Sequence, residues 1–337
     1  MPQVSVVLPV RDAAATLPRA LAGIEAQTLR DWELVAVADG STDATGEILR
    51  VAAARDPRVR VLTLGPVGIV GALNAGLAAA RAPLVARMDA DDESHPERLA
   101  AQADLLATQP AVGVVGCLVR FGGDRRAAAG YALHVDWLNS LVTSGQVSMR
   151  RFVEAPLAHP SAMFRRSLVE AHGGYRDGDF PEDYELWLRW LDAGVRFAKV
   201  PRELLIWHDP PARLSRTDPR YSPEAFFALK AVWLARWLAR EIESERRILV
   251  WGAGRPTRRR AAHLEAHGVA IAGYIDIDPK KTGRTVGGRP VLAPADLPAP
   301  GEAFVLAYVA SRGARELIGA DLARRGWVEG RDYLLCA

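Results

Sequence analysis

The stretch APLVARMDADD, residues 82–92, places an apolar, strand-like segment directly before three aspartates. Carboxylates this close repel and raise one another's pKa. Residues i and i+2 of an extended chain point to the same side, so Asp89 and Asp91 are expected to face one way. A divalent cation would offset the repulsion, and oxygen ligands of this kind suit Mg²⁺ or Mn²⁺. The alternative is a solvated acidic turn that caps the next helix.

Outward from this stretch, strand-like and helix-like segments alternate. Helical patterns follow at residues 17–27, after STDATG and at GALNAGLAAARAP, and Ser41 or Thr42 is placed to cap the second of these. The runs typical of strands buried in a parallel sheet are VSVVLPV, WELVAVADG, VRVLTLG and PLVARMD. The alternation predicts a doubly wound α/β sheet, in which ligands bind at the carboxyl ends of strands. Asp39 and Asp89 both fall at such ends.

The next part of the chain is less regular. We expect a helix at 97–109, a short strand at VGVVGCLVRF, and a loop at GGDRRAAAGY within the poorly patterned residues 120–158. EDYELWLRWLDAG predicts an amphipathic helix, with Trp187 and Trp190 in the core. VRFAKVPRELLIWHD is interpreted as a pair of strands.

Length and composition indicate two ordered domains. The chain has 337 residues, of which 49% are hydrophobic and 25% charged. The net charge of +3 predicts no broad nucleic-acid surface. Two distant cysteines fit a reducing cytosol, and we see neither a signal peptide nor an apolar membrane span. A cytoplasmic location is expected.

We expect domains at 1–221 and 247–337, joined by an amphipathic helix at 222–246. This helix is rich in tryptophan and arginine and has a wide apolar stripe. It is interpreted as packing the two domains together. Peripheral contact with the inner membrane face and a homodimer interface are the alternatives.

The second domain opens with ILVWGAG, a strand and turn followed by a helical pattern, as a dinucleotide-binding fingerprint requires. Gly252 would allow the tight turn, Gly254 the close approach of a phosphate, and Asp276 a contact to ribose hydroxyls. Thr257 occupies the third glycine position, so the fingerprint is incomplete. A structural or protein-interaction domain, a nucleotide-binding accessory domain and an NAD-dependent enzyme are the alternatives.

The N-terminal 210 residues resemble family 2 glycosyltransferases of the GT-A fold. The resemblance is carried, in order, by VSVVLPVRDAAATLPRALAGIEAQTL, WELVAVADGSTDAT, GALNAGLAAARAPLVARMDADDESHPERL, HPSAMFRRSLVEAHGGY and EDYELWLRWL. It implies a mostly parallel sheet between helices that binds a nucleotide-sugar at the strand carboxyl ends. The second domain resembles the small Rossmann-like α/β domains of sugar-modifying proteins and sugar O-acyltransferases.

The resemblance also implies roles for individual residues. Asp12 stands where the family usually has asparagine, which leaves that contact open. Asp89 would contact the ribose or metal and Asp91 the metal, with Asp92 in support. His208 would lie near the metal or diphosphate, and His159 on the acceptor side. The expected donor-binding residues are Pro9, Val10, Arg11, Asp39, Asn74, Arg87 and Asp89.

Asp183 would be the catalytic base, with Glu182 nearby; the alternative is that the two acids only favour a helix N-terminus. The expected activity is a metal-dependent, inverting transfer from a nucleotide-sugar, with UDP favoured, to a carbohydrate, lipid-linked or protein acceptor. Polysaccharide, glycolipid or glycoprotein assembly would be the setting. A non-catalytic, nucleotide-sugar-binding regulator is the alternative from another class.

Overall fold

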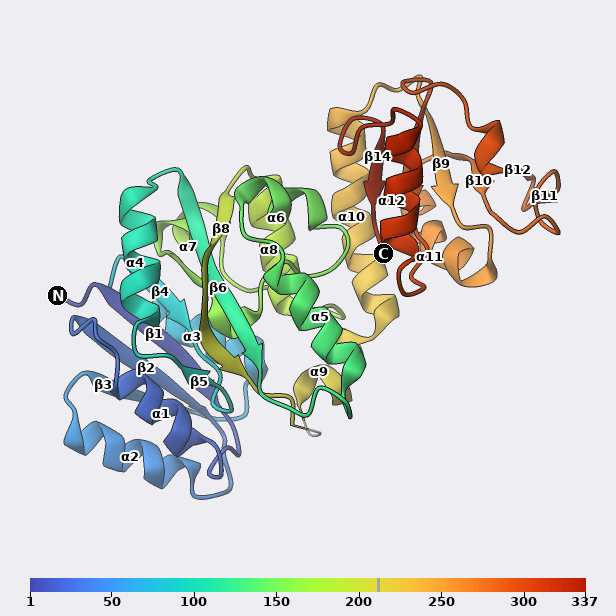
Figure 1. Ribbon diagram of the computed structural model, residues 1–337. Coiled ribbons are helices and arrows are strands. Elements are labelled where there is room, and N and C mark those ends of the chain that lie inside the picture. Colours follow the sequence, from blue (N-terminus) through green and yellow to red (C-terminus); the bar gives the residue numbers. More distant parts are fainter. Residues whose placement is uncertain (211–212) are drawn as a thin grey trace. The chain divides into compact units, whose positions relative to one another are not determined.

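The computed structural model describes residues 1–210 and 213–337 (Figure 1). The described residues divide into two compact units. The first comprises Met1–Ser148, Pro156–Gly178 and Glu182–Thr217, and the second Met149–Ala155, Asp179–Pro181 and Asp218–Ala337. The helix expected to link the domains, α10 (Pro223–Glu241), groups with the second unit.

The first unit is built on an eight-stranded mixed sheet in the order β3-β2-β1-β4-β7-β6-β8-β5. The pairs β1–β2, β2–β3, β1–β4 and β6–β8 are parallel, and β7 is antiparallel to both neighbours. The strands are β1 (Val4–Val10), β2 (Trp32–Asp39), β3 (Val59–Leu64), β4 (Leu84–Arg87), β5 (Glu93–Ser94), β6 (Val112–Phe121), β7 (Met163–Arg165) and β8 (Arg196–Trp207). The expected α/β fold of GT-A type is confirmed.

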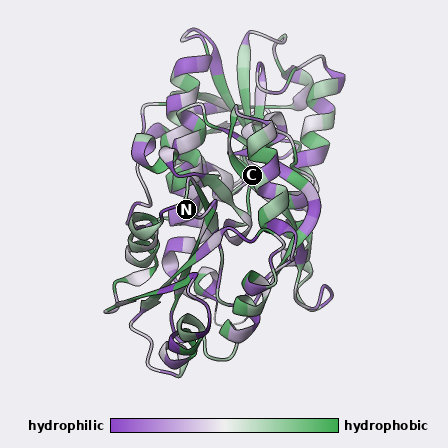
Figure 2. Cartoon of the chain, turned by 90° about the vertical axis from the view of Figure 1, so that its left-hand side faces the viewer, coloured by the Kyte–Doolittle hydropathy of each residue, from purple (hydrophilic) through white to green (hydrophobic). Residues whose placement is uncertain are grey.

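Helices cover both faces of this sheet because its central strands are apolar on both sides. Val6 and Leu8 of β1 pack with residues of α1, α2 and α4, whereas Val7 packs with residues of α3 and α8. Trp187 and Trp190 are fully buried on the α3 side, as predicted. The helices are α1 (Leu17–Glu25), α2 (Thr45–Arg55), α3 (Gly68–Ala79), α4 (Arg98–Thr108), α5 (Ala129–Asn139), α6 (Ser144–Arg150), α7 (Ser167–His172), α8 (Glu182–Asp192) and α9 (Leu214–Thr217). In Figure 2, several helices show green and purple segments in turn along their length, as expected for amphipathic helices.

Three local expectations were wrong. The segment interpreted as two strands is one bent strand, β8, whose pairing with β6 shifts register near Pro201. The loop expected at GGDRRAAAGY, residues 122–131, ends early, because α5 already begins at Ala129. Neither Ser41 nor Thr42 caps α2, because both bond to residue 12: the Asp12 amide donates to Ser41 Oγ at 3.1 Å, and Asp12 Oδ1 accepts from the Thr42 amide at 2.7 Å.

The second unit contains a smaller sheet in the order β11-β12-β10-β9-β13-β14. All its pairs are parallel except β11–β12. Numbered from β9, the parallel strands follow the order 3-2-1-4-5 of doubly wound sheets. The elements are β9 (Arg247–Trp251), α11 (Arg255–Glu265), β10 (Ile271–Ile275), β11 (Thr285–Val286), β12 (Arg289–Leu292), β13 (Ala303–Ala307), α12 (Ala314–Arg324) and β14 (Tyr333–Leu335).

Helix α10 begins with a capped turn, where Ser222 Oγ accepts a hydrogen bond from the Ala225 amide at 3.3 Å. Its tryptophans, Trp233 and Trp237, are buried, and the Trp237 ring lies 5.8 Å from that of Phe304. The Trp237 ring therefore packs within the second unit. Among the described residues, no helix has both the length and the apolar character needed to cross a membrane.

The close fit of α3 on the sheet predicts a stability difference between two helical glycines. A Cβ on Gly76 would lie 2.5 Å from Val7 Cγ1, whereas a Cβ on Gly46 in α2 would meet nothing within 4 Å. Gly76→Ala should lower the free energy of unfolding by about 1–3 kcal/mol through overpacking. Gly46→Ala should leave it unchanged or raise it by up to about 1 kcal/mol. Chemical denaturation measures both, and equal effects would contradict the packing argument.

Candidate functional site

Three aspartates meet at the carboxyl end of β4. One carboxylate oxygen from each of Asp89, Asp91 and Asp92 lies within 4.8 Å of the others. Strand β4 is held in the middle of the sheet between β1 and β7, so the acids that follow it have a fixed position. Asp92 is 1% exposed. The sequence prediction that Asp89 and Asp91 come together is confirmed, and Asp92 joins them.

Only one oxygen of the buried Asp92 carboxylate has a hydrogen-bond partner among the described residues. Its Oδ1 accepts a hydrogen bond from the His208 amide at 2.8 Å. Its Oδ2 is buried without a hydrogen-bond partner in the described part of the chain. Burial, together with the charges of Asp89 and Asp91, raises its pKa well above the ordinary value. A divalent cation would satisfy the orphaned oxygen and offset the repulsion, so these residues fit such an ion.

Arg87, at the end of β4, lies beneath the aspartates. Its Nη1 is 2.5 Å from Asp89 Oδ1 and also donates to the Met88 carbonyl. Burial disfavours its charge, but Asp89, Tyr175 and Glu182 outweigh burial and raise the pKa of its guanidinium. Arg87 is 3% exposed. The side chain is therefore committed to the acids around it, and the expected direct contact with a donor stays a prediction.

The predicted acid pair lies at the start of α8. Glu182 is 3% exposed, and Asp183 is half-buried. Asp183 Oδ1 accepts from the Tyr184 amide at 2.7 Å. Burial, opposed by Arg87 and assisted by Glu182, Asp183 and Asp89, raises the pKa of Tyr175 above its ordinary value. Glu182, Asp183 and Asp89 thus all act on one tyrosine, so the start of α8 and Asp89, which follows β4, lie in the same region.

His159 contacts the same tyrosine. Its Nε2 is 2.7 Å from Tyr175 Oη, and the two rings are 5.4 Å apart. Burial, followed by the positive charges of Arg87 and Arg213, lowers the pKa of His159 well below its ordinary value. The imidazole is therefore neutral at pH 7 and serves as a hydrogen-bonding group.

The expected donor side is formed where β1 and β2 end. Pro9 and Val10 are buried in β1, and Arg11 Nη1 lies 4.0 Å from Asp39 Oδ2. Asp39 Oδ1 accepts from the Val67 amide at 2.6 Å and from the Gly68 amide at 3.2 Å, at the start of α3. One oxygen of Asp39 thus fixes α3, and the other faces Arg11.

Asp12, found where asparagine is usual, has a positive φ of 46°. Aspartate and asparagine tolerate this conformation better than most residues. Its Oδ1 accepts from the Thr42 amide and, at 3.2 Å, from the Thr42 hydroxyl. The carboxylate therefore joins the loops after β1 and β2.

Asn74 makes a two-fold contact with the backbone of Tyr175. Its Nδ2 donates to the Tyr175 carbonyl at 2.9 Å, and its Oδ1 accepts from the Tyr175 amide at 3.0 Å. Asn74 therefore fixes the segment that carries the Tyr175 ring to the acids. Its expected contact to the donor stays a prediction.

His208 follows β8 beside the acid cluster. Its Nε2 is 2.7 Å from Glu93 Oε1, and its ring packs on Gly122, where an added Cβ would lie 2.6 Å from Nδ1. The group of possible metal ligands in the described residues contains Asp92 and not His208. His208 is thus placed next to the acids, while its role as a ligand stays a prediction.

Sequence reasoning missed Arg213. Its Nη1 donates to the His208 carbonyl at 3.3 Å, so one residue joins Arg213 to Asp92. Burial opposes its charge, but Tyr131, Asp89, Asp92 and Asp91 raise the pKa of the guanidinium. The signal that could have found it is an arginine a few residues after the end of β8, at the same edge as the aspartates.

In the second unit, the three predicted nucleotide-site residues lie together at the carboxyl ends of β9 and β10. Gly252 has a positive φ of 114°, and Gly254 is the N-cap of α11. Asp276 Oδ2 accepts from the Ala253 amide at 2.9 Å and from Lys281 Nζ at 3.1 Å. Its Oδ1 accepts from the Asp278 amide at 3.0 Å. Both oxygens of the expected ribose ligand therefore have partners within the chain.

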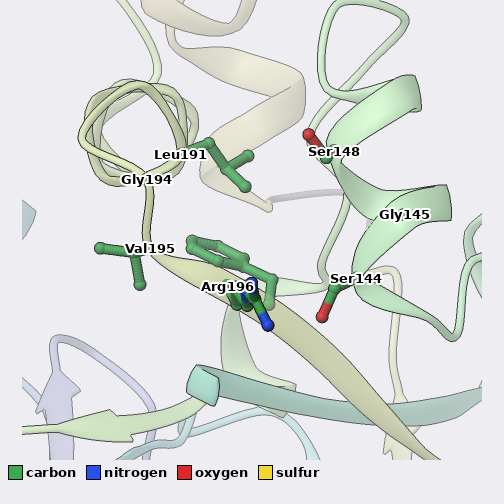
Figure 3. Close-up of a pocket in the computed structure, with 8 residues that line it drawn as sticks. Ser144, Gly145, Ser148, Leu191, Gly194, Val195 and Arg196 are labelled. Carbon is green, nitrogen blue, oxygen red and sulfur yellow. The ribbon is translucent and has the colours of Figure 1, made fainter. Parts of the chain in front are cut away.

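A pocket of about 290 Å³ lies elsewhere in the first unit (Figure 3). Ser144 and Ser148 of α6 line one side, and Leu191, Val195 and Arg196 the other. Arg196 begins β8, whereas His208 follows its end. The pocket therefore lies at the opposite end of β8 from His208, whose amide contacts Asp92. It takes no part in the acidic site.

The sequence model "Glycosyl transferase family 2" matches residues 5–173, half of the 337-residue chain. The chain belongs to glycosyl transferase family 2 and is a glycosyltransferase. This confirms the resemblance of the first domain and favours an enzyme over a non-catalytic regulator. The match ends before the second unit begins its own sheet.

The chain is similar to proteins named for the biosynthesis of amylovoran and of succinoglycan. The amylovoran biosynthesis glycosyltransferase AmsE of Erwinia amylovora is 29% identical over 204 residues, covering 58% of this chain and 71% of AmsE. The succinoglycan biosynthesis protein ExoO of Rhizobium meliloti is 30% identical over 264 residues, covering 70% of this chain and 69% of ExoO.

Solved structures share the fold. The mannosyltransferase PcManGT of Pyrobaculum calidifontis, solved with GDP-Man and Mn²⁺, superposes with a TM-score of 0.52 at 24% identity, covering 79% of this chain and 69% of that one. S. aureus TarS, solved with UDP-GlcNAc, gives 0.55 at 17% identity, covering 78% and 70%. At these identities the likeness concerns the fold alone.

The bonds from Asn74 predict a local effect on exchange. Asn74→Ala removes two hydrogen bonds to Tyr175, so amide exchange at Tyr175 should become faster, by up to about 10-fold for each 1.4 kcal/mol lost. Asn139→Ala is a matched control, because Asn139 makes the same two-fold contact with the backbone of Val119, at 2.9 and 2.7 Å. That variant should affect Val119 and leave Tyr175 unchanged. Hydrogen exchange followed by mass spectrometry measures both, and unaltered exchange at Tyr175 in Asn74→Ala would refute the assignment.

Proposed function

We propose that the enzyme transfers one sugar from a nucleotide-sugar to an acceptor hydroxyl, with a divalent cation and with inversion at the anomeric carbon. The observation that carries the proposal is the cluster of Asp89, Asp91 and Asp92, in which a buried carboxylate oxygen lacks a partner within the described residues. A site that leaves charge and hydrogen-bonding capacity uncompensated in this way is suited to an added cation.

The cation would be held by Asp91 and Asp89, with Asp92 completing the set and His208 beside it. Mn²⁺ and Mg²⁺ are the ions that suit oxygen ligands of this number. When bound, such an ion neutralises the negative charge that grows on the departing nucleoside diphosphate. Mn²⁺ accompanies GDP-Man in the PcManGT structure, which supports the same class of ion here.

Asp183 would act as the base. In the proposed step, the acceptor O–H gives its proton to the Asp183 carboxylate as the acceptor oxygen bonds to the anomeric carbon. The bond from that carbon to the diphosphate oxygen breaks, and its electron pair leaves with the nucleoside diphosphate. Asp183 suits this role better than Glu182, because Asp183 is half-buried at the start of α8 whereas Glu182 is 3% exposed.

The donor would lie along the carboxyl ends of β1 and β2. Pro9, Val10, Arg11 and the Asp39 oxygen that faces Arg11 would contact the base and ribose, and Arg213 would supply a fixed positive charge for the diphosphate. UDP-sugars are our first choice. TarS was solved with UDP-GlcNAc and PcManGT with GDP-Man, so both nucleotides need testing.

The acceptor would be a growing carbohydrate. AmsE and ExoO carry names from the biosynthesis of amylovoran and succinoglycan, which supports polysaccharide assembly. A lipid-linked or protein acceptor would use the same base and the same donor site. In each case the chemistry at the anomeric carbon is unchanged.

Metal removal tests the ion. With EDTA, release of nucleoside diphosphate from UDP- and GDP-sugars should stop, and added Mn²⁺ should restore it. Mn²⁺ should also raise the melting temperature of the wild type, because an ion that binds only the folded state stabilises it. Asp91→Asn should lose most of that increase. Full turnover in EDTA would sink the metal assignment.

Replacement of Asp183 tests its proposed role as the base. Asp183→Asn should lower kcat by about 10²- to 10⁴-fold with little change in donor affinity, because the amide cannot accept the acceptor's proton. Asp192→Asn, at the other end of α8, is the matched control and should keep full activity. Steady-state kinetics and calorimetric binding of the nucleotide separate the two effects. An Asp183→Asn enzyme with normal kcat would rule out this base.

A further inference from the structure

Arg213 is seated against two aromatic rings. Its guanidinium carbon lies 4.5 Å from the ring centroid of Trp207, at the end of β8, and 5.7 Å from that of Tyr131, in α5. The two rings are 5.2 Å apart and inclined at 52°. A guanidinium within about 6 Å of an aromatic ring is attracted to it, more strongly where water is excluded. The two rings thus contact each other and both contact Arg213, and this pair of rings is called the aromatic clamp below.

Polar contacts fix the guanidinium within the aromatic clamp. Arg213 Nη1 donates to the Tyr131 hydroxyl and, at 3.3 Å, to the His208 carbonyl. The His208 amide in turn donates to Asp92 Oδ1 at 2.8 Å. One residue of backbone therefore separates the clamped cation from the acid cluster. The three aspartates also help to raise the pKa of Arg213, against the effect of burial and after that of Tyr131.

Two further rings of α5, those of His134 and Trp137, extend the aromatic clamp. Tyr131 and His134 are three residues apart on α5, with rings 5.9 Å apart, and the His134 ring lies 6.3 Å from that of Trp207. Trp137 continues the row, 5.7 Å from His134. A row of this kind restricts the rotamers of the Tyr131 ring, so the position of its hydroxyl is set by packing.

We propose that Tyr131 and Trp207 are positioning residues that hold Arg213 ready for the diphosphate of the donor. This inference rests on the proposed function, in which Arg213 meets the diphosphate. A free arginine side chain loses rotamer entropy when it is fixed, and a preorganised one has already lost it before the ligand arrives. Tyr131 and Trp207 would thus raise donor affinity without touching the donor.

The alternative is that the three side chains only pack together and stabilise the loop after β8. The two roles differ in one measurable respect. If Tyr131 acts through Arg213, removing the Tyr131 hydroxyl matters only while Arg213 is present. If Tyr131 contributes by itself, its removal has the same effect in either background.

A double-mutant cycle on the full chain tests this. Binding of UDP and of GDP with Mn²⁺ is measured by calorimetry for the wild type, Tyr131→Phe, Arg213→Met and the double variant. Tyr131→Phe keeps the ring and removes one hydrogen bond, so affinity should fall about 3- to 10-fold. Arg213→Met should cost about 10- to 100-fold. In the Arg213→Met background, Tyr131→Phe should change affinity less than about 2-fold.

Further variants complete the test. Trp207→Phe keeps a smaller ring and should weaken binding about 2- to 5-fold, and Arg213→Lys should recover part of the loss in Arg213→Met. Arg216→Met is the matched control, because Arg216 lies three residues after Arg213, in α9, but pairs with Asp209, and it should bind as the wild type does. Thermal unfolding confirms that each variant is folded.

The outcomes separate the two proposals. Equal effects of Tyr131→Phe in both backgrounds, with wild-type binding intact, would overturn the aromatic clamp alone. Binding of neither UDP nor GDP by the wild type would overturn the proposed function, and the clamp with it. Loss of the Tyr131→Phe effect in the Arg213→Met background is the result we expect.

Discussion

Mutual repulsion among Asp89, Asp91 and Asp92 is the constraint on which the rest of the first unit depends. Carboxylate oxygens within 4.8 Å of one another disfavour the folded chain unless something offsets them. The fold holds them because β4 is paired on both sides and ends beneath them. The fold thus holds three acids together in spite of their repulsion. A cation and an anionic substrate can bind to such a cluster and offset the repulsion.

The chain supplies part of the compensation through buried arginines that do not neutralise the whole cluster. Of the three aspartates, Arg87 forms an ion pair with Asp89. Arg98 is fully buried, and its Nη1 and Nη2 donate to the carbonyls of Pro160 and Arg87, at 2.6 and 3.2 Å. Positive charge therefore stands near the acids, while Asp92 Oδ2 keeps no partner within the described chain. This arrangement reduces the repulsion among the aspartates in the folded chain and leaves them able to bind an ion.

The sequence was sufficient for features with a strong local pattern. Continuous apolar runs identify β1, β2 and β4, and the D-A-D spacing identifies Asp89 and Asp91. It was insufficient where a contact joins distant residues. The sequence predicts Ser41 as a helix cap, but its hydroxyl accepts a hydrogen bond from the Asp12 amide instead. Tyr131 lies 82 residues from Arg213. Such pairs have no periodicity, so only the folded sheet brings them together.

The second unit shows how a motif can be satisfied by packing. A Cβ on Gly252 would lie 2.9 Å from the side chains of Thr257 and Val309, so the glycine is required by its neighbours whether or not a ligand binds. Thr257 fills the place where the fingerprint has glycine, and Asp276 is occupied by the Ala253 amide and by Lys281. A nucleotide here would have to displace Lys281 from Asp276 to reach that carboxylate. The strand–turn–helix pattern therefore accounts for the fold of this unit, and its physical basis is complete without a nucleotide.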